Sequence, residues 1–388
     1  MKTYDYIIAG AGAAGLQLAW FMANDPFFRQ KQILLIEKEP KNKNDRTWCF
    51  WEQGTGPFEE IVFRVWEQAY FGSKGYSNSF SLAPYAYKMI QAIDFYTYIL
   101  DFLKQQANIH IRYEEVKDIQ ETDTKVRVNT SKGYYTGNKL FSSIFDPQEI
   151  QIQKKHPVLS QHFIGWFLKT EDPVFNPGEI AFMDFDIPQR GNTRFMYLLP
   201  FSKHEALLEY TLFSEKLLTD EEYEKGIEDY LQEKNIRSYT VTAKEKGSIP
   251  MTSFNFSKKT TQHHMPIGTA GGWTKASTGF TFKNTTEKTK QLTEFLKHNT
   301  DLRKFNTPSR FSFYDRILLD ILFRKNELGS MIFSKLFRKN KPQTILRFLE
   351  EKTSFTQELS IMWSVADRNF TGTFFRCLVP RSIKKYDS

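Results

Sequence analysis

Residues 4–15 of the chain read YDYIIAGAGAAG, an apolar run followed by a glycine-rich turn. The apolar run is rich in aromatic and β-branched residues, and residues 16–24 carry helix formers with apolar residues at helical spacing. Gly10, Gly12 and Gly15 therefore stand between a predicted strand and a predicted helix, with the spacing GxGxxG. This arrangement indicates a Rossmann-type nucleotide-binding unit.

Each part of this fingerprint has a physical reason. Gly10 permits a tight turn, Gly12 lets backbone N–H groups approach a pyrophosphate, and Gly15 allows the helix to pack closely on the strand. A second buried strand is predicted at residues 31–37 and ends in Glu37, whose carboxylate can accept hydrogen bonds from ribose hydroxyls. Because strand, turn, helix, strand and acid fall in register, we expect a bound dinucleotide.

The predicted cofactor is FAD. The fingerprint alone does not separate FAD from NAD, but a second glycine-rich turn at residues 268–279 gives the layout of a flavoprotein, in which that turn closes over the flavin side. Arg46 is expected to touch FAD or to fix the loop around it, with a plain surface position as the alternative. The predicted cofactor-binding residues are Gly10, Gly12, Ala13, Ala14, Gly15, Glu37, Lys38, Arg46, Gly268, Gly271, Gly272, Thr278, Gly279 and Phe280.

The predicted secondary structure of the rest of the chain changes at two positions. From about residue 160, short alternating segments broken by Pro and Gly predict an antiparallel layer inserted into a parallel one, and from about 300 the chain is helical, basic and rich in Phe and Leu. We expect an α/β fold with an N-terminal Rossmann-type FAD-binding domain, an inserted antiparallel substrate domain and a C-terminal helical region. The predicted boundaries are 1–75, 100–158 and 246–299 for the FAD-binding domain, 76–99 and 159–245 for the substrate domain, and 300–388 for the helical region.

Bulk properties exclude several classes of function. The formal net charge is +8, but no zinc-finger spacing, RNP-like strand or arginine-rich arm accompanies it, so nucleic acid is not an expected partner. Cys49 and Cys377 form neither a metal motif nor a disulfide framework, which suits a reducing cytoplasm. Neither a signal peptide nor a membrane-spanning helix is expected. The aromatic fraction of 16% fits either an A/T-rich genome or a large apolar tunnel.

Four groups of segments, in this order, resemble the bacterial lycopene cyclase family of flavoproteins. They are 44–52 (NDRTWCFWE), 161–166 (QHFIGW) with 181–185 (AFMDF), 195–202 (FMYLLPFS) with 206–211 (ALLEYT), and 268–272 (GTAGG) with 277–281 (STGFT). Two departures bear on the flavin cradle: Ala276 stands where the family's loop usually has Pro, and residues 145–147 replace a more glycine- or arginine-bearing turn.

The resemblance implies an enzyme that closes rings at the ends of lycopene and related linear carotenes. The expected reaction begins with protonation of a terminal alkene and ends with proton loss, needs reduced FAD with NADPH as the reductant, and moves no net electrons. The alternatives are a flavin monooxygenase or isoprenoid reductase, and a non-catalytic carotenoid-binding protein. The choice between β and ε rings, closure of one or both ends, and the oligomeric state are left open.

Glu209 is the predicted acid. It occupies the first Glu position of the family's Phe-Leu-Glu-Glu-Thr-like motif, where Tyr210 stands at the second. Alternation in a strand places Glu209 on the face of Leu207 and opposite Leu208. If that face is buried, desolvation raises the pKa of the carboxyl and leaves a proton to donate. An edge-strand Glu facing solvent is the alternative.

Asp184 is the second predicted catalytic residue, either to take the departing proton or to hold Glu209 in place, with a strand-end turn as the alternative. Aromatic faces can steady a carbocation, and the candidates, which are otherwise core rings, are Trp166, Phe182, Tyr197 and Tyr210. His162, His263 and His264 have no carboxylate or Cys at metal-ligand spacing, so no metal site is expected.

Residues 311–323 and 331–337 place Phe, Leu and Ile on broad helical faces, with Arg and Lys around them. This pattern fits an interfacial helix pair on anionic lipid, and equally a helical cap packed on the flavin domain. Because the expected substrate dissolves only in membranes, we expect a cytoplasmic protein bound peripherally to the cytoplasmic membrane surface.

Overall fold

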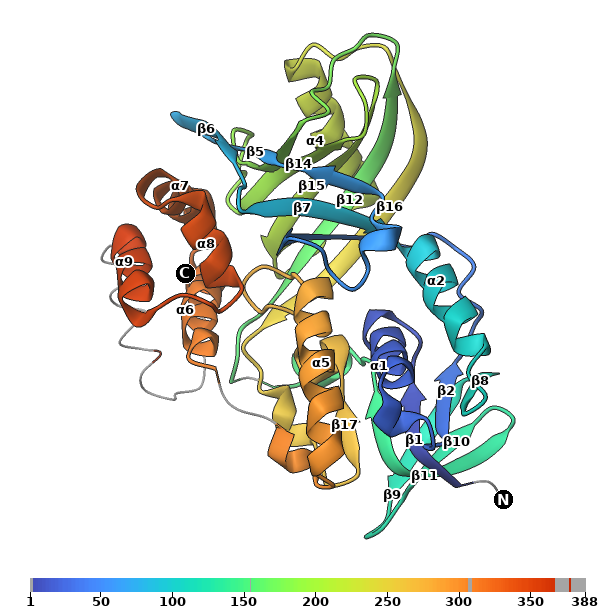
Figure 1. Cartoon of the computed structure of the whole chain (residues 1–388). Helices are drawn as coiled ribbons and strands as arrows, with labels where there is room; N and C mark the ends of the chain where they lie inside the picture. Colours follow the sequence, from blue (N-terminus) through green and yellow to red (C-terminus); the bar gives the residue numbers. More distant parts are fainter. Residues whose placement is uncertain (1–2, 154, 306–308, 367–376, 378–388) are drawn as a thin grey trace.

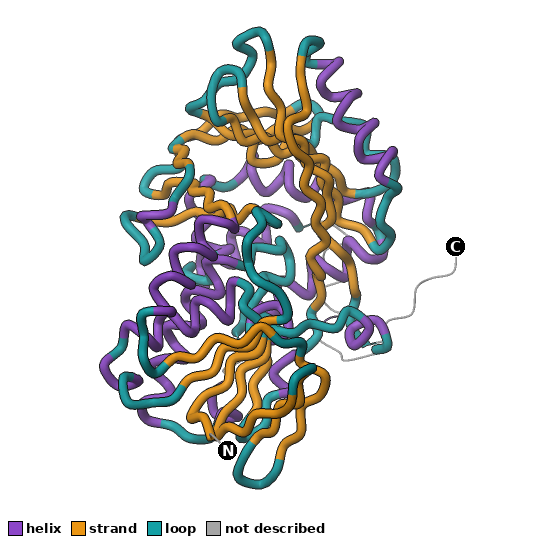
Figure 2. The backbone as a smooth tube through the Cα atoms, turned by 90° about the vertical axis from the view of Figure 1, so that its right-hand side faces the viewer, coloured by secondary structure: helices purple, strands orange, loops and turns teal. Residues whose placement is uncertain are grey.

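The computed structural model describes residues 3–366, apart from 154 and 306–308, together with Cys377. Two large sheets lie at opposite ends of the molecule with helices between and beside them (Figures 1 and 2). One sheet is largely parallel, the other is largely antiparallel, and the last described part of the chain is helical. The predicted fold class is confirmed.

The nucleotide-binding sheet has the strand order β8-β2-β1-β11-β10-β9, with β17 paired to β11. Its strands are β1 (Thr3–Ala9), β2 (Ile33–Glu37), β8 (Ile109–Tyr113), β9 (Val116–Glu121), β10 (Val126–Thr130), β11 (Gly133–Ser142) and β17 (His264–Pro266). The pairs β1–β2, β2–β8, β1–β11 and β11–β17 are parallel, whereas β9, β10 and β11 form an antiparallel meander. The hairpin expected around Ser131-Lys132-Gly133 is the turn between β10 and β11.

Successive side chains of β1 and β2 point to opposite faces of this sheet, and each face packs against different elements. Ile8 and Leu35 join a core with the helices α1 (Ala13–Asn24), α2 (Ala92–Lys104) and α5 (Phe282–His298). Ile7 and Leu34 point to the other face and pack against residues of β10 and β11. All five residues of β2 are buried, as expected for a parallel strand covered on both sides.

The antiparallel sheet has the order β16-β12-β15-β14-β13-β5-β6, in which only β13 and β5 run parallel. Its strands are β5 (Gln68–Ser73), β6 (Tyr76–Ser81), β12 (Val158–Thr170), β13 (Glu179–Asp184), β14 (Thr193–Pro200), β15 (Glu205–Ser214) and β16 (Tyr239–Thr252). The sheet thus takes in residues 68–75 and extends to Thr252, both outside the ranges expected for the substrate domain.

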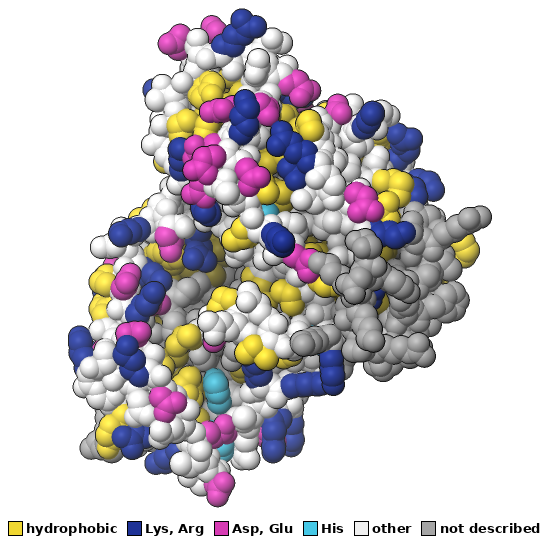
Figure 3. Space-filling view, turned by 180° about the vertical axis from the view of Figure 1, so that it is seen from behind, with side chains coloured by type: hydrophobic (Ala, Val, Ile, Leu, Met, Phe, Trp, Pro, Cys, Tyr) yellow, Lys and Arg dark blue, Asp and Glu magenta, His cyan; other side chains and the backbone are white. Residues whose placement is uncertain are grey.

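The two faces of the antiparallel sheet have different partners. Leu208 and Leu212 of β15 pack against α4 (Asp220–Glu233), which begins at a capping box formed by Thr219 and Glu222. Leu207 and Phe213 point to the opposite face, toward the C-terminal helices. On the outer side of the sheet, acidic and basic side chains are interspersed (Figure 3), which suits a solvated surface.

Among the described residues, the remaining elements are a small sheet of order β3-β7-β4 and four helices that follow α5. They are β3 (Thr47–Gln53), β4 (Arg64–Trp66), β7 (Tyr85–Gln91), α6 (Phe311–Arg324), α7 (Gly329–Lys339), α8 (Pro342–Leu349) and α9 (Phe355–Val365). The short helices are η1 (Pro26–Phe28), η2 (Glu59–Ile61), α3 (Gln148–Gln151), η3 (Phe256–Lys259), η4 (Gly268–Gly271), η5 (Leu302–Phe305) and η6 (Asn326–Leu328).

The C-terminal helices are packed on the antiparallel sheet. The rings of Phe337 in α7 and Phe71 in β5 stack with their centroids 4.2 Å apart, and Phe333 stacks on Phe185 at 5.3 Å. In the part of the chain that the structure describes, no helix is both long enough and apolar enough to cross a membrane.

Candidate active site

One continuous cavity of about 660 Å³ joins the three regions of the molecule. It begins at the glycine turn after β1, passes the loop 268–281 and the inner face of β12, β15 and β16, and ends among α6, α7, α8 and α9. A polar nucleotide-binding end and an apolar end walled by Phe, Leu and Ile side chains therefore share one space.

The glycine turn has the geometry that its fingerprint predicts. Gly10 has a φ of +98°, and a Cβ there would lie 2.2 Å from Ser143 Oγ. A Cβ on Gly15 would lie 1.9 Å from the carbonyl oxygen of Gly10, so only glycine lets α1 pack this closely on the turn. Around a Cβ on Gly12 no atom of the described structure lies within 4 Å, which leaves the approach open for a phosphate group.

The first turn of α1 can receive an anion. Gly12 is its N-cap, no side chain caps it, and it contains no acidic residue. Its backbone N–H groups and the positive end of the helix dipole therefore face the cavity, where Gly12, Ala13 and Ala14 form part of the wall.

Glu37, at the end of β2, stabilises this turn through hydrogen bonds. Its buried carboxylate accepts hydrogen bonds from the backbone N–H of Ala11 at 2.6 Å and of Lys38 at 3.0 Å, and Lys41 Nζ lies 3.5 Å away. The side chain of Lys38 itself is exposed. Glu37 therefore holds the glycine turn in shape as well as standing where a ribose is expected.

The predicted cofactor residues divide into two groups. Those that line the cavity are Gly12, Ala13, Ala14, Arg46, Gly268, Thr278, Gly279 and Phe280. Those outside the lining are Gly10, Gly15, Glu37, Gly271 and Gly272, which shape the loops behind it, and Lys38, whose side chain is exposed. Gly271 belongs to the second group because its Cβ position lies 2.3 Å from the carbonyl oxygen of Pro266.

Of the unpaired polar atoms in the wall, two lie at the second glycine-rich loop. Gln161 Oε1 and Thr278 Oγ1 are buried and have no partner among the residues that the structure describes. Buried polar atoms are rarely left unpaired, so both fit a bound polar group such as a flavin ring. Of the departures from the family's pattern, Phe145 and Pro147 line the cavity, whereas Ala276 packs into the adjoining core.

The second glycine-rich loop is tied to the C-terminal helices by a buried lysine. Lys275 Nζ lies 3.0 Å from Asp315 in α6 and 2.9 Å from Glu351 after α8. Burial alone would lower the pKa of Lys275, but the two carboxylates outweigh it and raise the pKa. This ion-pair cluster holds the polar and apolar ends of the cavity together.

Glu209 lies in the wall of the cavity and is 8% exposed. It shares a face of β15 with Leu207, as alternation predicted. On the neighbouring strand β12 its register partner is Gly165, and Gly165 also pairs with Glu245 of β16. Two glutamates therefore flank one glycine on the cavity face of the sheet.

Gly165 makes room for both side chains. A Cβ at this position would lie 2.9 Å from Glu209 Cγ and 3.2 Å from Glu245 Cγ. The carboxyl groups of Glu209 and Glu245 are close enough to shift each other's pKa, and Glu245 Oε2 accepts a hydrogen bond from Thr47 Oγ1 at 2.9 Å. Like-charged groups this close cannot both be ionised without a large cost.

The surroundings of the pair favour a retained proton. Burial, and after it the neighbouring Glu245, raises the pKa of Glu209 well above its usual range. Burial also raises the pKa of Glu245, although its hydrogen bonds to Glu209 and Thr47 oppose that change. A proton retained on the pair is therefore favoured over ionisation of both carboxyl groups.

A neutral hydrogen-bonded group lies beside the pair. Tyr197 OH donates to Tyr87 OH at 2.7 Å, and Cys49 contacts Tyr197. Burial raises the pKa values of all three groups, so each keeps its proton. All three line the cavity, and they add polarity near Glu209 without adding charge.

Asp184 lies elsewhere. It is buried, is absent from the cavity wall, and accepts hydrogen bonds from Tyr230 OH at 3.0 Å and from the backbone N–H of Asp186 at 3.0 Å. Because β13 has a register irregularity between Ala181 and Asp184, simple alternation does not hold there. Asp184 is the strand-end acid that the alternative interpretation described, and it faces α4.

The aromatic candidates divide in the same way. Phe182 and Tyr197 line the cavity, whereas Trp166 and Tyr210 lie in the core against α4. The histidine His162 is structural: its ring bonds Ser214 Oγ at 2.7 Å and Tyr223 OH at 2.5 Å, and burial lowers its pKa to about 4.

Sequence reasoning missed Glu245. Lysines on both sides of it suggest an exposed strand, and its place opposite Gly165 follows only from the pairing of β16 with β12. The available signal was Gly165 itself, because a glycine inside a strand indicates close approach of another group.

Comparison with known proteins agrees with this geometry. A family model described as lycopene cyclase protein matches residues 5–374. A lycopene beta-cyclase from Pantoea ananas is 26% identical over 261 residues, which are 64% of this chain and 63% of that protein. The chain thus spans about 63% of the length of the curated relative that it matches.

Solved structures show the fold. A geranylgeranyl bacteriochlorophyll reductase-like protein from Thermoplasma acidophilum has a TM-score of 0.60 at 12% identity and covers 97% of this chain and 98% of its own. A Klebsiella pneumoniae HpxO variant complexed with FAD has a TM-score of 0.62 at 13% identity and covers 90% and 98%. The expected resemblance is confirmed at the level of the family, because the matching family model covers nearly the whole sequence. This chain belongs to the lycopene cyclase family.

Proposed function

We propose that this protein is a lycopene beta-cyclase that converts linear lycopene to beta-carotene, through gamma-carotene, with no net change in oxidation state. The observation that carries the proposal is the position of Glu209. An acid with a raised pKa lies in the wall of a cavity that joins a dinucleotide site to a long apolar end. Protonation of a hydrocarbon needs an acid, a dry pocket and room for a linear apolar chain.

In the proposed reaction the Glu209 O–H bond breaks and a C–H bond forms at the terminal alkene of the carotene. The resulting cation is attacked by a second double bond, which closes the ring. A base then takes a proton from a ring carbon to give the product, and exchange with water protonates Glu209 again. The faces of Phe182 and Tyr197 lie in the same wall and can stabilise the cation by about 1 kcal/mol each.

FAD is the proposed cofactor, with NADPH as the reductant that prepares it. The glycine turn, the uncapped first turn of α1 and the unpaired atoms of Gln161 and Thr278 are the groups that would hold it. When bound in reduced form, FAD supplies negative charge next to the apolar end of the cavity. The residues of this chain hold the proton, exclude water and fix the conformation of the bound carotene.

We further propose that the protein works at the cytoplasmic surface of a membrane, from which α9 takes up the carotene. Phe355, Leu359 and Trp363 recur every four residues on one face of α9 and are 60%, 43% and 77% exposed. Ile361 and Val365 of the same helix line the cavity. Exposed basic residues on the neighbouring α7 and α8, among them Arg338, Lys339 and Arg347, suit an anionic lipid surface.

Flotation with vesicles that contain anionic lipid tests the membrane proposal. We expect the holoenzyme to float with the vesicles and the triple variant Phe355→Ser, Leu359→Ser, Trp363→Ser to stay behind. A matched control is Phe27→Ser, which removes an exposed ring from η1 at the other end of the molecule. Equal flotation of the triple variant and the wild type contradicts the role of α9.

Anaerobic incubation tests the reaction itself. The photoreduced holoenzyme is mixed with lycopene in detergent, and the products are separated by chromatography while the flavin absorbance is followed. We expect cyclic carotenes to accumulate over many turnovers while the flavin stays reduced. A product formed only as the flavin is oxidised, one equivalent for each turnover, would instead identify an isoprenoid reductase or monooxygenase.

A further inference from the structure

We propose that Glu245 is a positioning residue that shares one proton with Glu209 across Gly165 and so keeps Glu209 in its acid form. This inference rests on the proposed function, since it explains how the acid of that reaction holds its proton. It concerns a residue on a different strand, which the family's motifs in this sequence do not include.

The first support is the sheet register. Glu209 of β15 and Glu245 of β16 both pair with Gly165, the residue between them on β12. Because neighbouring strands lie about 5 Å apart, side chains two strands apart meet only when the residue between them is small. Any larger residue at Gly165 would stand between the carboxyl groups, since even a Cβ would lie 2.9 Å from Glu209 Cγ.

The second support is the hydrogen-bond count of Glu245. Its Oε2 accepts from Thr47 Oγ1 at 2.9 Å. Its Oε1 is buried and has no donor among the described residues. Leaving a buried acceptor unpaired costs about 1–3 kcal/mol, and more for a charged group. A proton on the adjacent Glu209 supplies the missing donor.

The third support is the charge around the pair. The titratable groups that face it are Cys49 of β3, Tyr87 of β7 and Tyr197 of β14, and burial keeps all three neutral. Lys246 also lines the cavity, but its ammonium group pairs with Asp220. No lysine or arginine acts on the pKa of Glu209 or Glu245, so among the described residues no cation compensates a second negative charge at the pair, and retention of one proton is favoured.

The sign of the pH effect follows from this arrangement. The reaction needs the protonated acid, so kcat falls as the pH rises through the pKa of Glu209. The negative charge of Glu245 raises that pKa, and Glu245→Gln removes the charge while keeping the size of the side chain. The alkaline limb of the kcat profile should therefore move to lower pH.

The experiment compares kcat against pH for the reduced holoenzyme, Glu245→Gln and Glu245→Asp. We expect Glu245→Gln to move the alkaline limb down by about one pH unit or more, with little change in KM. Glu245→Asp retains a carboxylate and should restore most of the wild-type profile. The matched control is Glu205→Gln at the exposed start of β15, which should not move the limb. An unmoved limb in a folded, flavin-binding Glu245→Gln overturns the proposal.

A second measurement needs neither the carotene nor a variant at position 245. The infrared carbonyl band of a protonated carboxyl is followed against pH in the wild-type protein and assigned by its loss in Glu209→Gln. We expect the band at neutral pH and its disappearance only on the alkaline side. No such band at neutral pH overturns the shared proton. Since this titration uses no lycopene, its result stands apart from failure of the cyclase reaction.

Discussion

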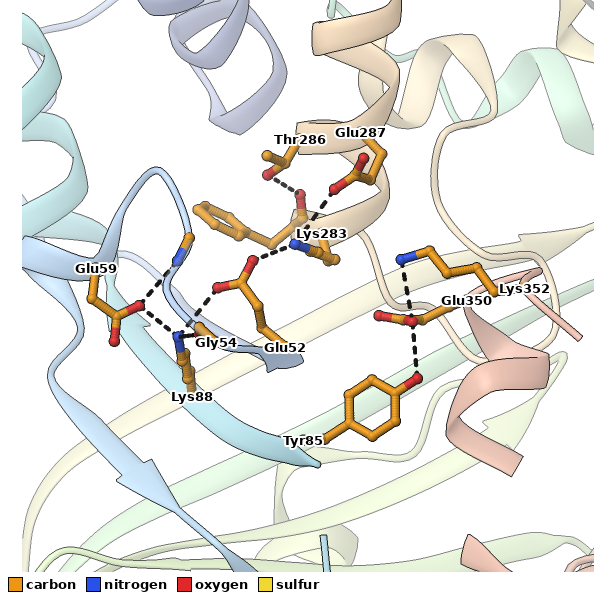
Figure 4. Close-up of polar contacts among 12 residues, drawn as sticks. Glu52, Gly54, Glu59, Tyr85, Lys88, Lys283, Thr286, Glu287, Glu350 and Lys352 are labelled. Carbon is orange, nitrogen blue, oxygen red and sulfur yellow. Dashed lines mark hydrogen bonds and ion pairs between the residues drawn. The ribbon is translucent and has the colours of Figure 1, made fainter. Parts of the chain in front are cut away.

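Glu52 and Glu209 are two buried glutamates in opposite electrostatic surroundings. Their exposed fractions are nearly the same, 6% and 8%. Glu52 on β3 lies between two lysines: its Oε2 is 3.3 Å from Lys88 Nζ, and its Oε1 pairs with Lys283 of α5 (Figure 4). Glu209 has another carboxyl beside it. Burial alone therefore does not decide the chemistry of a buried acid; the sign of the nearest charge does.

The cluster around Glu52 is an ion-pair network that links several elements, and Glu52 and Lys283 also line a second pocket. Lys88 also bonds the carbonyl oxygen of Gly54 at 2.8 Å and Glu59 at 2.5 Å, and Lys283 reaches Glu287 at 3.4 Å (Figure 4). These contacts join β3, β7 and α5 behind the cavity. The pair at Glu209 is open on one side to that cavity, where its proton can reach a substrate.

The largest effect is expected for Glu209→Gln. Glutamine has nearly the same shape but cannot give up a proton, so kcat should fall by about 10²–10⁴-fold, the usual contribution of a general acid. Product formation by chromatography, with flavin absorbance and carotene binding as controls, measures this change. Glu205→Gln on the same strand should behave as the wild type. A Glu209→Gln variant that cyclises at a normal rate would contradict the assignment.

Glu52→Gln should lower the stability of the protein and leave its kcat unchanged, which is the opposite of the effect expected for Glu209→Gln. The substitution removes the buried carboxylate between Lys88 and Lys283, while Glu59 and Glu287 still pair with these lysines. The cost should therefore stay below about 3–5 kcal/mol, the cost of a fully broken buried ion pair. Urea denaturation of the holoprotein should show this loss of unfolding free energy, while the protein that remains folded keeps its kcat. The control is the exposed Glu67→Gln, which should be neutral. Unchanged stability in Glu52→Gln would show that the cluster is not structural.

Gly165→Ala should separate the two glutamates. Its Cβ would meet Glu209 Cγ, Leu207 Cδ1 at 3.0 Å and Glu245 Cγ, and overpacking of this kind costs about 1–3 kcal/mol. We expect a lower unfolding free energy together with a lower kcat, read from urea denaturation and product formation. Gly178→Ala is the control because its nearest neighbour would be 3.5 Å away. Normal activity in Gly165→Ala would show that the carboxyl contact is not needed.

The smallest effect is expected for Asp184→Asn. Asparagine keeps one acceptor oxygen for the backbone N–H of Asp186, and its NH2 group can donate to the Tyr230 hydroxyl oxygen, so the cost should be about 1 kcal/mol in unfolding free energy. Because Asp184 does not line the cavity, kcat should change little. A loss of kcat as large as that in Glu209→Gln, with stability retained, would show that Asp184 takes part in the reaction.

The sequence was most informative where the physics is local. The spacing of Gly10, Gly12 and Gly15 predicted the turn in detail, because Gly10 and Gly15 lie too close to neighbouring atoms for a side chain and Gly12 leaves open space in front of the turn. Alternation was enough to place Glu209 on the face of Leu207. It was not enough for Asp184, because an irregular register in β13 changes which way the side chain points.

The pairing of strands that lie far apart in the chain could not be predicted from the sequence. Glu245 is separated from Glu209 by α4, and the two meet only because β15 and β16 flank β12 with Gly165 as common partner. A shift of one residue in either pairing would turn one carboxyl to the opposite face of the sheet. For the same reason the link from Lys275 to Asp315 and Glu351 could not be predicted, since it depends on where the C-terminal helices dock.

Solvent deuterium labelling is the sharpest test that an exchangeable proton of Glu209 starts the ring closure. Prereduced holoenzyme and Glu209→Gln are each given lycopene in D₂O under anaerobic conditions, and the carotenes are analysed by mass spectrometry. We expect the wild type to form rings that each carry a single deuterium, with no reductant consumed, and Glu209→Gln to return unlabelled lycopene. Rings without deuterium, or labelled rings formed readily by Glu209→Gln, would contradict the role given to this carboxyl.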